Sequence, residues 1–349
     1  MVWRKVRRGA RRSASLALLN LGAILVIGGR LWESQSALAA GATFFTLVIA
    51  WAMWLVSRLW RRSVNRRFAI TGTFYRLAGA SILVGATIGA ALGIGAFDDT
   101  SSYLEHRNVH MTLNILGWAG LTVVGTAITL LPTILHVRAP KLRAVRIVPW
   151  LMFGGLALFA AGATIGSAWV GSVGMLSYTF GLATFGGYVR EVLSVSRRRK
   201  VPTAALHLVA ALAWLAITTV TLVAFSAVED HAALRDFIVV GGAAGFVFQA
   251  VLGAWSFLLP STRAPLPGVR RRELVAMELG GRAQVLVYNL GLVAVLVGLR
   301  GGVDSAAAGI IMAWSAAAWA LAKSWGFPLL ASLPLVRARS QRWWAAPKE

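Results

Sequence analysis

Hydrophobic residues run through this chain in long blocks that short polar segments separate. Ten such blocks lie at about 13–30, 36–57, 70–96, 110–135, 147–167, 171–190, 203–227, 236–259, 283–300 and 304–324. Most are close to the ~20 residues that an α-helix needs to cross about 30 Å of hydrocarbon. The pattern predicts an all-α integral membrane protein with a bundle of about ten transmembrane helices.

The polar segments between these blocks alternate in charge. Arg and Lys gather in 1–12, 58–67, 138–146, 196–200, 261–282 and 337–342, whereas the segments between them hold Glu33, Asp98, Asp99, Glu105, Glu229, Asp230, Asp236 and Asp304. Short loops rich in Lys and Arg stay on the cytoplasmic side of a membrane. We therefore expect both termini to be cytoplasmic and the number of helices to be even.

The same reading divides the chain into three parts. Residues 1–12 form a basic cytoplasmic N-terminus, 13–324 a polytopic membrane domain, and 325–349 a cytoplasmic tail along the membrane interface. No small-residue cleavage site follows the first apolar block, so we expect the first helix to remain as a signal anchor. The longest connection, 260–282, is predicted to contain a short interfacial helix at about 270–278.

Composition supports the membrane assignment and narrows the chemistry. Hydrophobic residues make up 58% of the chain and charged residues 13%, more apolar surface than one soluble core can bury. The net charge of +23 acts as an orientation signal and an attraction to anionic lipid, and no nucleic-acid partner is expected. Cysteine is absent, which excludes disulfides, iron–sulfur clusters, thiolate-ligated haem and cysteine nucleophiles.

The fourth block carries polar and small residues on one helical face. That stripe consists of His106, His110, Asn114, Gly117, Leu121, Gly125 and Thr129. Small residues and threonines let membrane helices approach closely and bond to one another. In the eighth block Gln249 is expected to bond Asn114 or Asn289, or else a cofactor propionate.

Arg76 lies inside the third apolar block. Its long side chain either snorkels back to the cytoplasmic face, or pairs with Glu191 or with an acidic group of a ligand.

Histidines are the candidate ligands, because the chain has five of them and no cysteine. His106 and His110 lie one turn apart, and with Met111 beside them they could bind copper from the outer side. Haem instead needs axial ligands, commonly one histidine on each of two facing helices. His231 is another outer histidine, and His136 with His207 forms an alternative cytoplasmic pair. The plain alternative is that such helix-end histidines are solvated or hydrogen-bonded.

Several stretches together are similar to one family. HMTLNILGWAGLTVVGTAITLLPTIL (110–135) and RRFAITGTFYRLAGASILVGATIGAALG (66–93) resemble the membrane portion of actinobacterial multicopper-oxidase (copper-oxidase, nitrite-reductase-like) fusion proteins. GFVFQAVLGAWSFLLP (245–260) and RAQVLVYNLGLVAVL (282–296) resemble two of its later helices. The histidine-led motif also resembles, more distantly, subunit I of haem–copper oxidases.

The resemblance implies a multi-pass protein of the bacterial cytoplasmic (inner) membrane that binds haem b or copper. It places His110 at the family's signature histidine, with His106 second. The chain departs from the family in two ways, because no cupredoxin-like domain is attached and the first block, LALLNLGAILVIGG, has Asn20 and no histidine. It also has fewer histidines than a complete haem–copper oxidase uses, so we do not expect an isolated oxidase.

Three functions follow from these observations. The first is a redox-associated membrane protein that holds haem b or copper near His110 and serves or anchors a periplasmic cupredoxin or respiratory partner. The second is a small-molecule or ion transporter, although the pattern shows no paired broken helices of the kind that line many transport sites. The third is a cofactor-free scaffold subunit of a membrane complex.

Overall fold

The structure is a computed structural model that describes residues 2–61, 66–97, 99–141, 143–196, 201–227, 231–263, 266–301, 303–326, 330 and 332–342. Regular structure in this part of the chain is helical throughout. Eight of the described helical stretches are long and apolar enough to cross a membrane. The all-α fold is therefore confirmed for the described residues, and the eight candidate spans support a multi-pass membrane protein, while the total of ten spans and the side on which the termini lie stay predictions.

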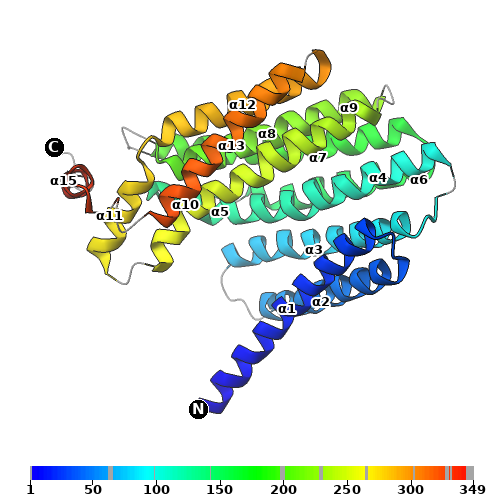
Figure 1. Cartoon of the computed structure of the whole chain (residues 1–349), viewed down its shortest axis with the longest axis horizontal. Coiled ribbons are helices and arrows are strands. Elements are labelled where there is room, and N and C mark those ends of the chain that lie inside the picture. The colour runs from blue at the N-terminus through cyan, green and yellow to red at the C-terminus, as the bar shows by residue number, and fades with distance from the viewer. Residues whose placement is uncertain are drawn as a thin grey trace. The chain divides into compact units, whose positions relative to one another are not determined.

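The helices follow the predicted apolar blocks, although α1 and α4 begin about ten residues before theirs. They are α1 (Val2–Leu31), α2 (Gln35–Arg61), α3 (Arg66–Gly93), α4 (Thr100–Thr112), η1 (Leu113–Gly120), α5 (Leu121–Leu135), η2 (Ala144–Arg146), α6 (Val148–Thr164), α7 (Ala168–Val195), α8 (Thr203–Ala227), α9 (His231–Asp236), η3 (Phe237–Phe248), α10 (Gln249–Arg263), α11 (Pro267–Met277), α12 (Gly281–Gly301), α13 (Val303–Trp325) and α15 (Pro334–Arg342). Figure 1 shows their order along the chain.

Two compact units divide the chain. Unit 1 comprises Met1–Thr126, Leu142–Phe185 and Leu222–Leu234, and unit 2 comprises Ala127–Lys141, Gly186–Thr221 and Arg235–Glu349.

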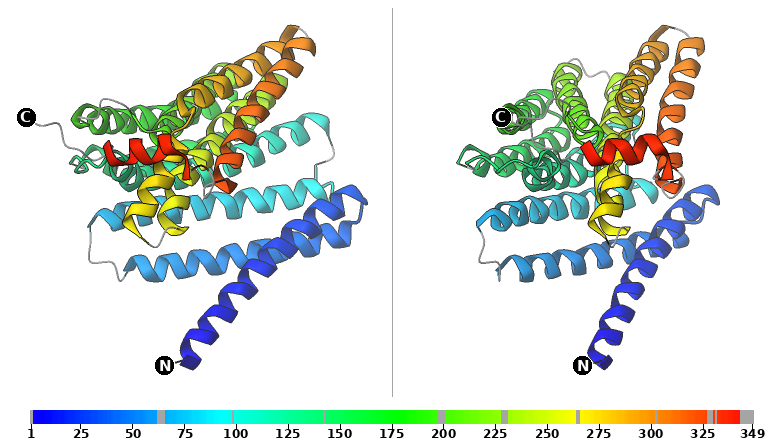
Figure 2. Two further views of the ribbon diagram at one scale, coloured as in Figure 1. Left: turned by 60° about the vertical axis from the view of Figure 1, so that its left-hand side comes forward. Right: turned by 90° about the vertical axis from the view of Figure 1, so that its left-hand side faces the viewer.

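In unit 1 the first three helices pack in sequence, α1 on α2 and α2 on α3, and Figure 2 shows them side by side in blue. Glycines make the close approach possible, because a Cβ at Gly22 would lie 3.0 Å from the backbone nitrogen of Phe45. Helix α3 packs in turn on α4 and η1. Small residues at such contacts are the usual means by which membrane helices associate. This packing holds the polar face of α4 against α3.

In unit 2 the largest helix pair is α12 with α13. A Cβ at Gly291 would lie 2.7 Å from the carbonyl oxygen of Gly309, and a Cβ at Gly309 2.7 Å from the nitrogen of Val295. Helix α8 lies against η3 and α10. A side chain at Gly245 of η3 would collide with the indole of Trp214 of α8. The Nε1 of Trp214 donates to Asn289 Oδ1 at 2.6 Å, which ties α8 to α12.

Two long helices each contain a π-helical stretch. Leu113–Gly120 continues α4 into α5, and Phe237–Phe248 continues α9 into α10. The two stretches share a pattern, because Gly117, Gly125 and Pro132 have the same spacing as Gly245, Gly253 and Pro260. In both a tyrosine hydroxyl donates to a carbonyl at the same point, Tyr178 to Leu116 and Tyr288 to Ala244, each at 2.9 Å. The π-helical turns therefore occur at matching positions of two long helices.

The basic loop before α12 forms a small layer with the tail. Helix α11 covers most of the predicted helix at 270–278, and Val275 and Ala276 pack there with Val336 of α15. The predicted tail at 325–349 is described only at 325–326, 330 and 332–342, and its end at 343–349 lies outside the described residues. The predicted N-terminus at 1–12 is helical from Val2, while the side chains of residues 1–15 lie outside the described part.

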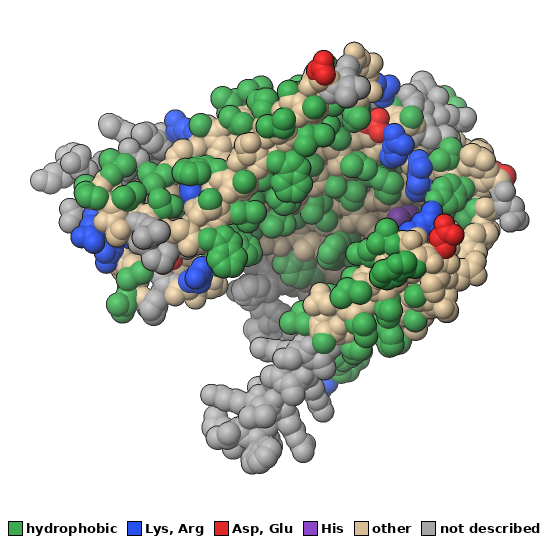
Figure 3. All heavy atoms as spheres, viewed as in Figure 1, with side chains coloured by type: hydrophobic (Ala, Val, Ile, Leu, Met, Phe, Trp, Pro, Cys, Tyr) green, Lys and Arg blue, Asp and Glu red, His purple; other side chains and the backbone are tan. Residues whose placement is uncertain are grey.

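Apolar side chains cover the flanks of the helices. Large hydrophobic residues such as Leu47, Phe180 and Ile311 are each more than 60% exposed, and Figure 3 shows such side chains over most of the visible face. Arg and Lys gather toward the ends of the helices in the same view. A surface of this kind matches a lipid bilayer, the partner that the composition predicts.

Candidate functional site

Helix α4 begins well before the apolar block that predicts it. Asp99 caps it, because its Oδ1 accepts the backbone N–H of Ser102 at 2.7 Å, a frequent way for a helix to begin. The helix therefore starts at Thr100 rather than near residue 110. Both His106 and His110 lie within it, one turn apart.

His106 bonds to its own helix. Its Nδ1 donates to the carbonyl oxygen of Ser102 at 2.8 Å, and its ring stacks on Phe97 with the centroids 4.0 Å apart. The ring thus turns back toward the start of α4 and covers the loop that follows α3.

His110 bonds across to α3 instead. Its Nδ1 lies 2.7 Å from the carbonyl oxygen of Gly85, so Nδ1 carries the proton and donates it. The ring also lies against Gly89, where a Cβ would come within 2.7 Å of Nδ1. Two glycines one turn apart on α3 therefore make the slot that holds this ring. Nε2 keeps its lone pair, which is the arrangement of a histidine that ligates a metal.

Asn114 completes the polar stripe one turn further on. Its Nδ2 donates to the His110 carbonyl oxygen at 2.7 Å and lies 3.3 Å from the His110 Nδ1 and 3.5 Å from its Nε2. A Cβ at Gly85 would lie 3.0 Å from the Asn114 Oδ1, so this side chain also packs on α3. The structure thus brings together His110 and Asn114, two residues of the predicted stripe.

The described residues contain no group of three or more His, Asp or Glu side chains that could hold a metal ion, and copper ligation by His106, His110 and Met111 stays a prediction. His106 and His110 turn toward different partners, and Met111 projects about 100° around the helix from His110. Haem makes a smaller demand on the protein, because its porphyrin supplies four ligands and the protein has to supply only an axial one.

Gln249 belongs to a second polar site, in unit 2. It is fully buried, and neither its Oε1 nor its Nε2 has a hydrogen-bond partner among the described residues. One turn along α10 on the same face, a Cβ at Gly253 would lie 3.1 Å from the Cβ of His207. Gln249 and His207 therefore lie on facing surfaces of α10 and α8.

His207 is itself buried and pairs with α12. The amide nitrogen of Gln284 lies 3.2 Å from the His207 Nε2. Because an amide nitrogen can only donate, Nε2 accepts and Nδ1 carries the proton. Within the described part this Nδ1 has no partner, nor does the Gln284 Oε1. Unpaired buried polar atoms of this kind each cost about 1–3 kcal/mol unless water or a ligand satisfies them.

Two charged residues close this site on the basic side. Lys323 is 1% exposed and donates from Nζ to the carbonyl oxygens of Met277 and Leu279, at 2.8 and 3.2 Å. Glu278 accepts the backbone N–H of Thr203 at 2.9 Å and its hydroxyl at 2.8 Å, and so caps the start of α8. A cation at the end of α11 and a carboxylate at the start of α8 both suit the helix dipoles.

The remaining histidines have local surroundings. His136 follows α5 with a φ of 58°, the left-handed conformation that often ends a helix, and its Nδ1 bonds to the Ile134 carbonyl at 3.2 Å. His231 starts α9, and its side chain lies outside the described part. The predicted pair of His136 and His207 thus consists of a helix-end residue and a buried residue bonded to Gln284.

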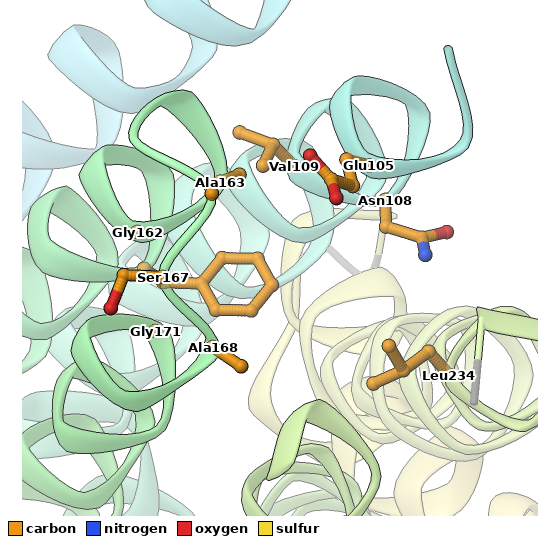
Figure 4. Close-up of a pocket in the computed structure, with 11 residues that line it drawn as sticks. Glu105, Asn108, Val109, Gly162, Ala163, Ser167, Ala168, Gly171 and Leu234 are labelled. Carbon is orange, nitrogen blue, oxygen red and sulfur yellow. The ribbon is translucent and has the colours of Figure 1, made fainter. Parts of the chain in front are cut away.

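Two pockets lie beside the polar residues. One, of about 80 Å³, is in unit 1, where Glu105 and Asn108 of α4 line it together with Gly162, Ala163 and Ser167 (Figure 4). It has room for a few waters and is much smaller than the ~300–1,000 Å³ of ordinary ligand sites. The other, of about 380 Å³, is apolar and lies between η3, α12 and α13, with Tyr288 and Trp314 among its lining residues.

Sequence reasoning found His110 and Gln249 but missed Gln284 and Lys323. His207 and Gln284 are 77 positions apart, and no motif links them. His207 and Gln284 each lie near the basic end of an otherwise apolar helix, α8 and α12, and this shared position is the signal in the sequence that could have linked them. Comparison with known families, curated proteins and solved structures finds no match to this chain.

Proposed function

We propose that this chain is a redox-associated protein of the bacterial cytoplasmic membrane that binds one haem b through the Nε2 of His110. Both termini are cytoplasmic in this proposal, and the haem lies toward the outer side. It serves or anchors a periplasmic cupredoxin or respiratory partner and is not an oxidase by itself. The resemblance of 60–300 to oxidase-associated membrane segments points the same way.

One observation carries the proposal: the hydrogen bond from His110 Nδ1 to the Gly85 carbonyl oxygen. It fixes the tautomer, orients the ring and leaves Nε2 as the electron-pair donor. Asn114 lies against the same ring, with its Nδ2 3.5 Å from Nε2, and its amide can bond a haem propionate. Bound haem would supply one-electron chemistry, while α3 and α4 supply orientation.

The test is an absorbance spectrum of protein purified from haem-sufficient cells, with haem quantified per chain. The wild type is expected to show a Soret band at about one haem per chain, and His110→Ala to lose it. His106→Ala is the matched control and should retain the band, because His106 bonds only to its own helix and Phe97. A wild-type preparation without haem or copper would contradict the proposal and favour a cofactor-free scaffold.

A second candidate, a transporter for small polar solutes, has its own support. The buried, unpaired amide of Gln249 follows the π-helical stretch of α9–α10, and a second π-helical stretch matches it in α4–α5. Interrupted helices at corresponding positions are a mark of transport sites. Light scattering of proteoliposomes would test it with glycerol and urea. Faster swelling than in empty vesicles, lost in Gln249→Leu, is the expected result, and equal rates would reject transport of these solutes.

A further inference from the structure

A groove of about 380 Å³ opens on unit 1 between α2, α3 and α6. It is lined by Met53, Trp54, Ser57, Thr73, Arg76, Leu77, Ala80, Leu83 and Trp150. Ser57 is one turn from the end of α2, and Trp150 lies in the first turn of α6. The groove therefore starts at the end of unit 1 where α2 ends at Arg61 and α6 begins at Val148.

Polarity changes along this groove. Ser57, Thr73 and Arg76 lie toward the basic end, whereas Leu77, Ala80 and Leu83 follow on α3. From Thr73 to Leu83 α3 rises about 15 Å, at about 1.5 Å per residue. That length is about half of the ~30 Å hydrocarbon thickness, so it corresponds to one leaflet. The groove thus has a polar head and an apolar stem, which together span about the depth of one lipid monolayer.

The charge of the groove is positive. None of its lining residues is acidic, and Arg58 extends over the Trp54 ring with its Cζ 5.4 Å from the centroid. Trp54 and Trp150 are 53% and 59% exposed, as expected of tryptophans at the level of lipid headgroups. The Arg76 guanidinium presents a planar fork of donors that matches a phosphate.

We propose that this groove binds one anionic phospholipid. Arg76 pairs with its phosphate, the tryptophans flank the headgroup, and one acyl chain lies along Leu77, Ala80 and Leu83. Basic pockets between membrane helices bind acidic lipid headgroups by this chemistry. The groove does not include His110, so the lipid proposal does not depend on haem binding.

Native mass spectrometry of the purified chain in a neutral detergent tests this directly. Phosphatidylglycerol, phosphatidylcholine with the same acyl chains, and inorganic phosphate are added in separate arms. We expect the wild type to retain phosphatidylglycerol, and Arg76→Gln to retain it about fivefold less, the effect of one basic residue near an acidic lipid. Arg282→Gln is the matched control, an exposed arginine of the basic side that lies outside the groove.

A second variant tests the stem. Ala80→Trp fills the apolar part and is expected to lower phosphatidylglycerol retention while leaving Arg76 in place. Equal retention by wild type and Arg76→Gln, or equal retention of phosphatidylcholine and phosphatidylglycerol, would overturn the proposal. Binding of inorganic phosphate that competes with the lipid would show an anion site rather than a lipid site.

Discussion

The His110 ring is held by two glycines of α3. Gly85 provides the carbonyl oxygen that accepts from Nδ1, and Gly89 provides the space beside the ring. A Cβ at Gly89 would collide with the imidazole, and one at Gly85 would press on the Asn114 side chain. The orientation of Nε2 therefore depends as much on residues that lack side chains as on the histidine itself.

Gly89→Ala tests this dependence. The added Cβ would collide with the His110 ring, so haem content per chain is expected to fall at least tenfold, a loss of about 1.4 kcal/mol. Gly154→Ala is the control, because nothing lies within 4 Å of a Cβ there. The control should keep its haem and gain up to about 1 kcal/mol of stability from the higher helix propensity of alanine. Normal haem content in Gly89→Ala would argue against the slot.

Gln249 and Gln284 offer a contrast between two buried amides. Gln249→Leu removes an amide that has no partner among the described residues and should stabilise the fold by about 1–2 kcal/mol. Gln284→Leu removes the partner of the His207 Nε2 and should destabilise it by a similar amount. Thermal unfolding in detergent, followed by tryptophan fluorescence, measures both. A loss of stability in Gln249→Leu would mean that a bound molecule satisfies this amide.

At the scale of elements, the positions of the helices can be predicted from the sequence, whereas the positions of the π-helical stretches cannot. Apolar length fixes where a membrane helix runs, so the blocks at 36–57 and 203–227 match α2 and α8 within a few residues. A π-helical turn differs from an α-helical one in the carbonyl oxygen that each backbone N–H bonds. The pattern of hydrophobic residues does not indicate which carbonyl is used. The Gly85–His110 bond joins positions 25 apart on different helices, so a stripe on α4 alone predicts the histidine but not its partner.

Each π-helical stretch accepts a hydrogen bond from a tyrosine hydroxyl, and the contribution of that bond to stability can be measured. Tyr178 is fully buried and donates to the Leu116 carbonyl oxygen, which lies within η1. Tyr178→Phe keeps the ring and removes this bond, so we expect a lower melting temperature and a loss of about 1 kcal/mol. Phe185→Leu, a substitution in the same helix that removes no hydroxyl, separates loss of packing from loss of the bond. An unchanged melting temperature in Tyr178→Phe would show that the carbonyl is satisfied in another way.

At the scale of the whole molecule, the charge pattern predicts the orientation of the protein in the membrane. Every basic segment is predicted to lie on one side of the membrane and every acidic one on the other. The exposed apolar flanks and the eight membrane-length helices support a multi-pass protein. The side of the membrane on which each terminus lies is predicted from the charge pattern alone.

The absence of cysteine makes this orientation easy to measure. Single substitutions Ser101→Cys and Lys141→Cys place thiols in an acidic and a basic segment, both exposed. A membrane-impermeant maleimide applied to intact spheroplasts should label Ser101→Cys, and should label Lys141→Cys only after permeabilisation. The opposite pattern would invert the predicted topology and move His110 to the cytoplasmic side.

The most direct test of the central claim is chemical rescue of His110. His110→Gly removes the imidazole and leaves its slot beside Gly85 and Gly89 open. We predict that this variant lacks the Soret band of the wild type and that added imidazole restores it in proportion to its concentration, while His106→Gly needs no imidazole. A His110→Gly protein that shows a full, unshifted Soret band without imidazole would contradict ligation by His110.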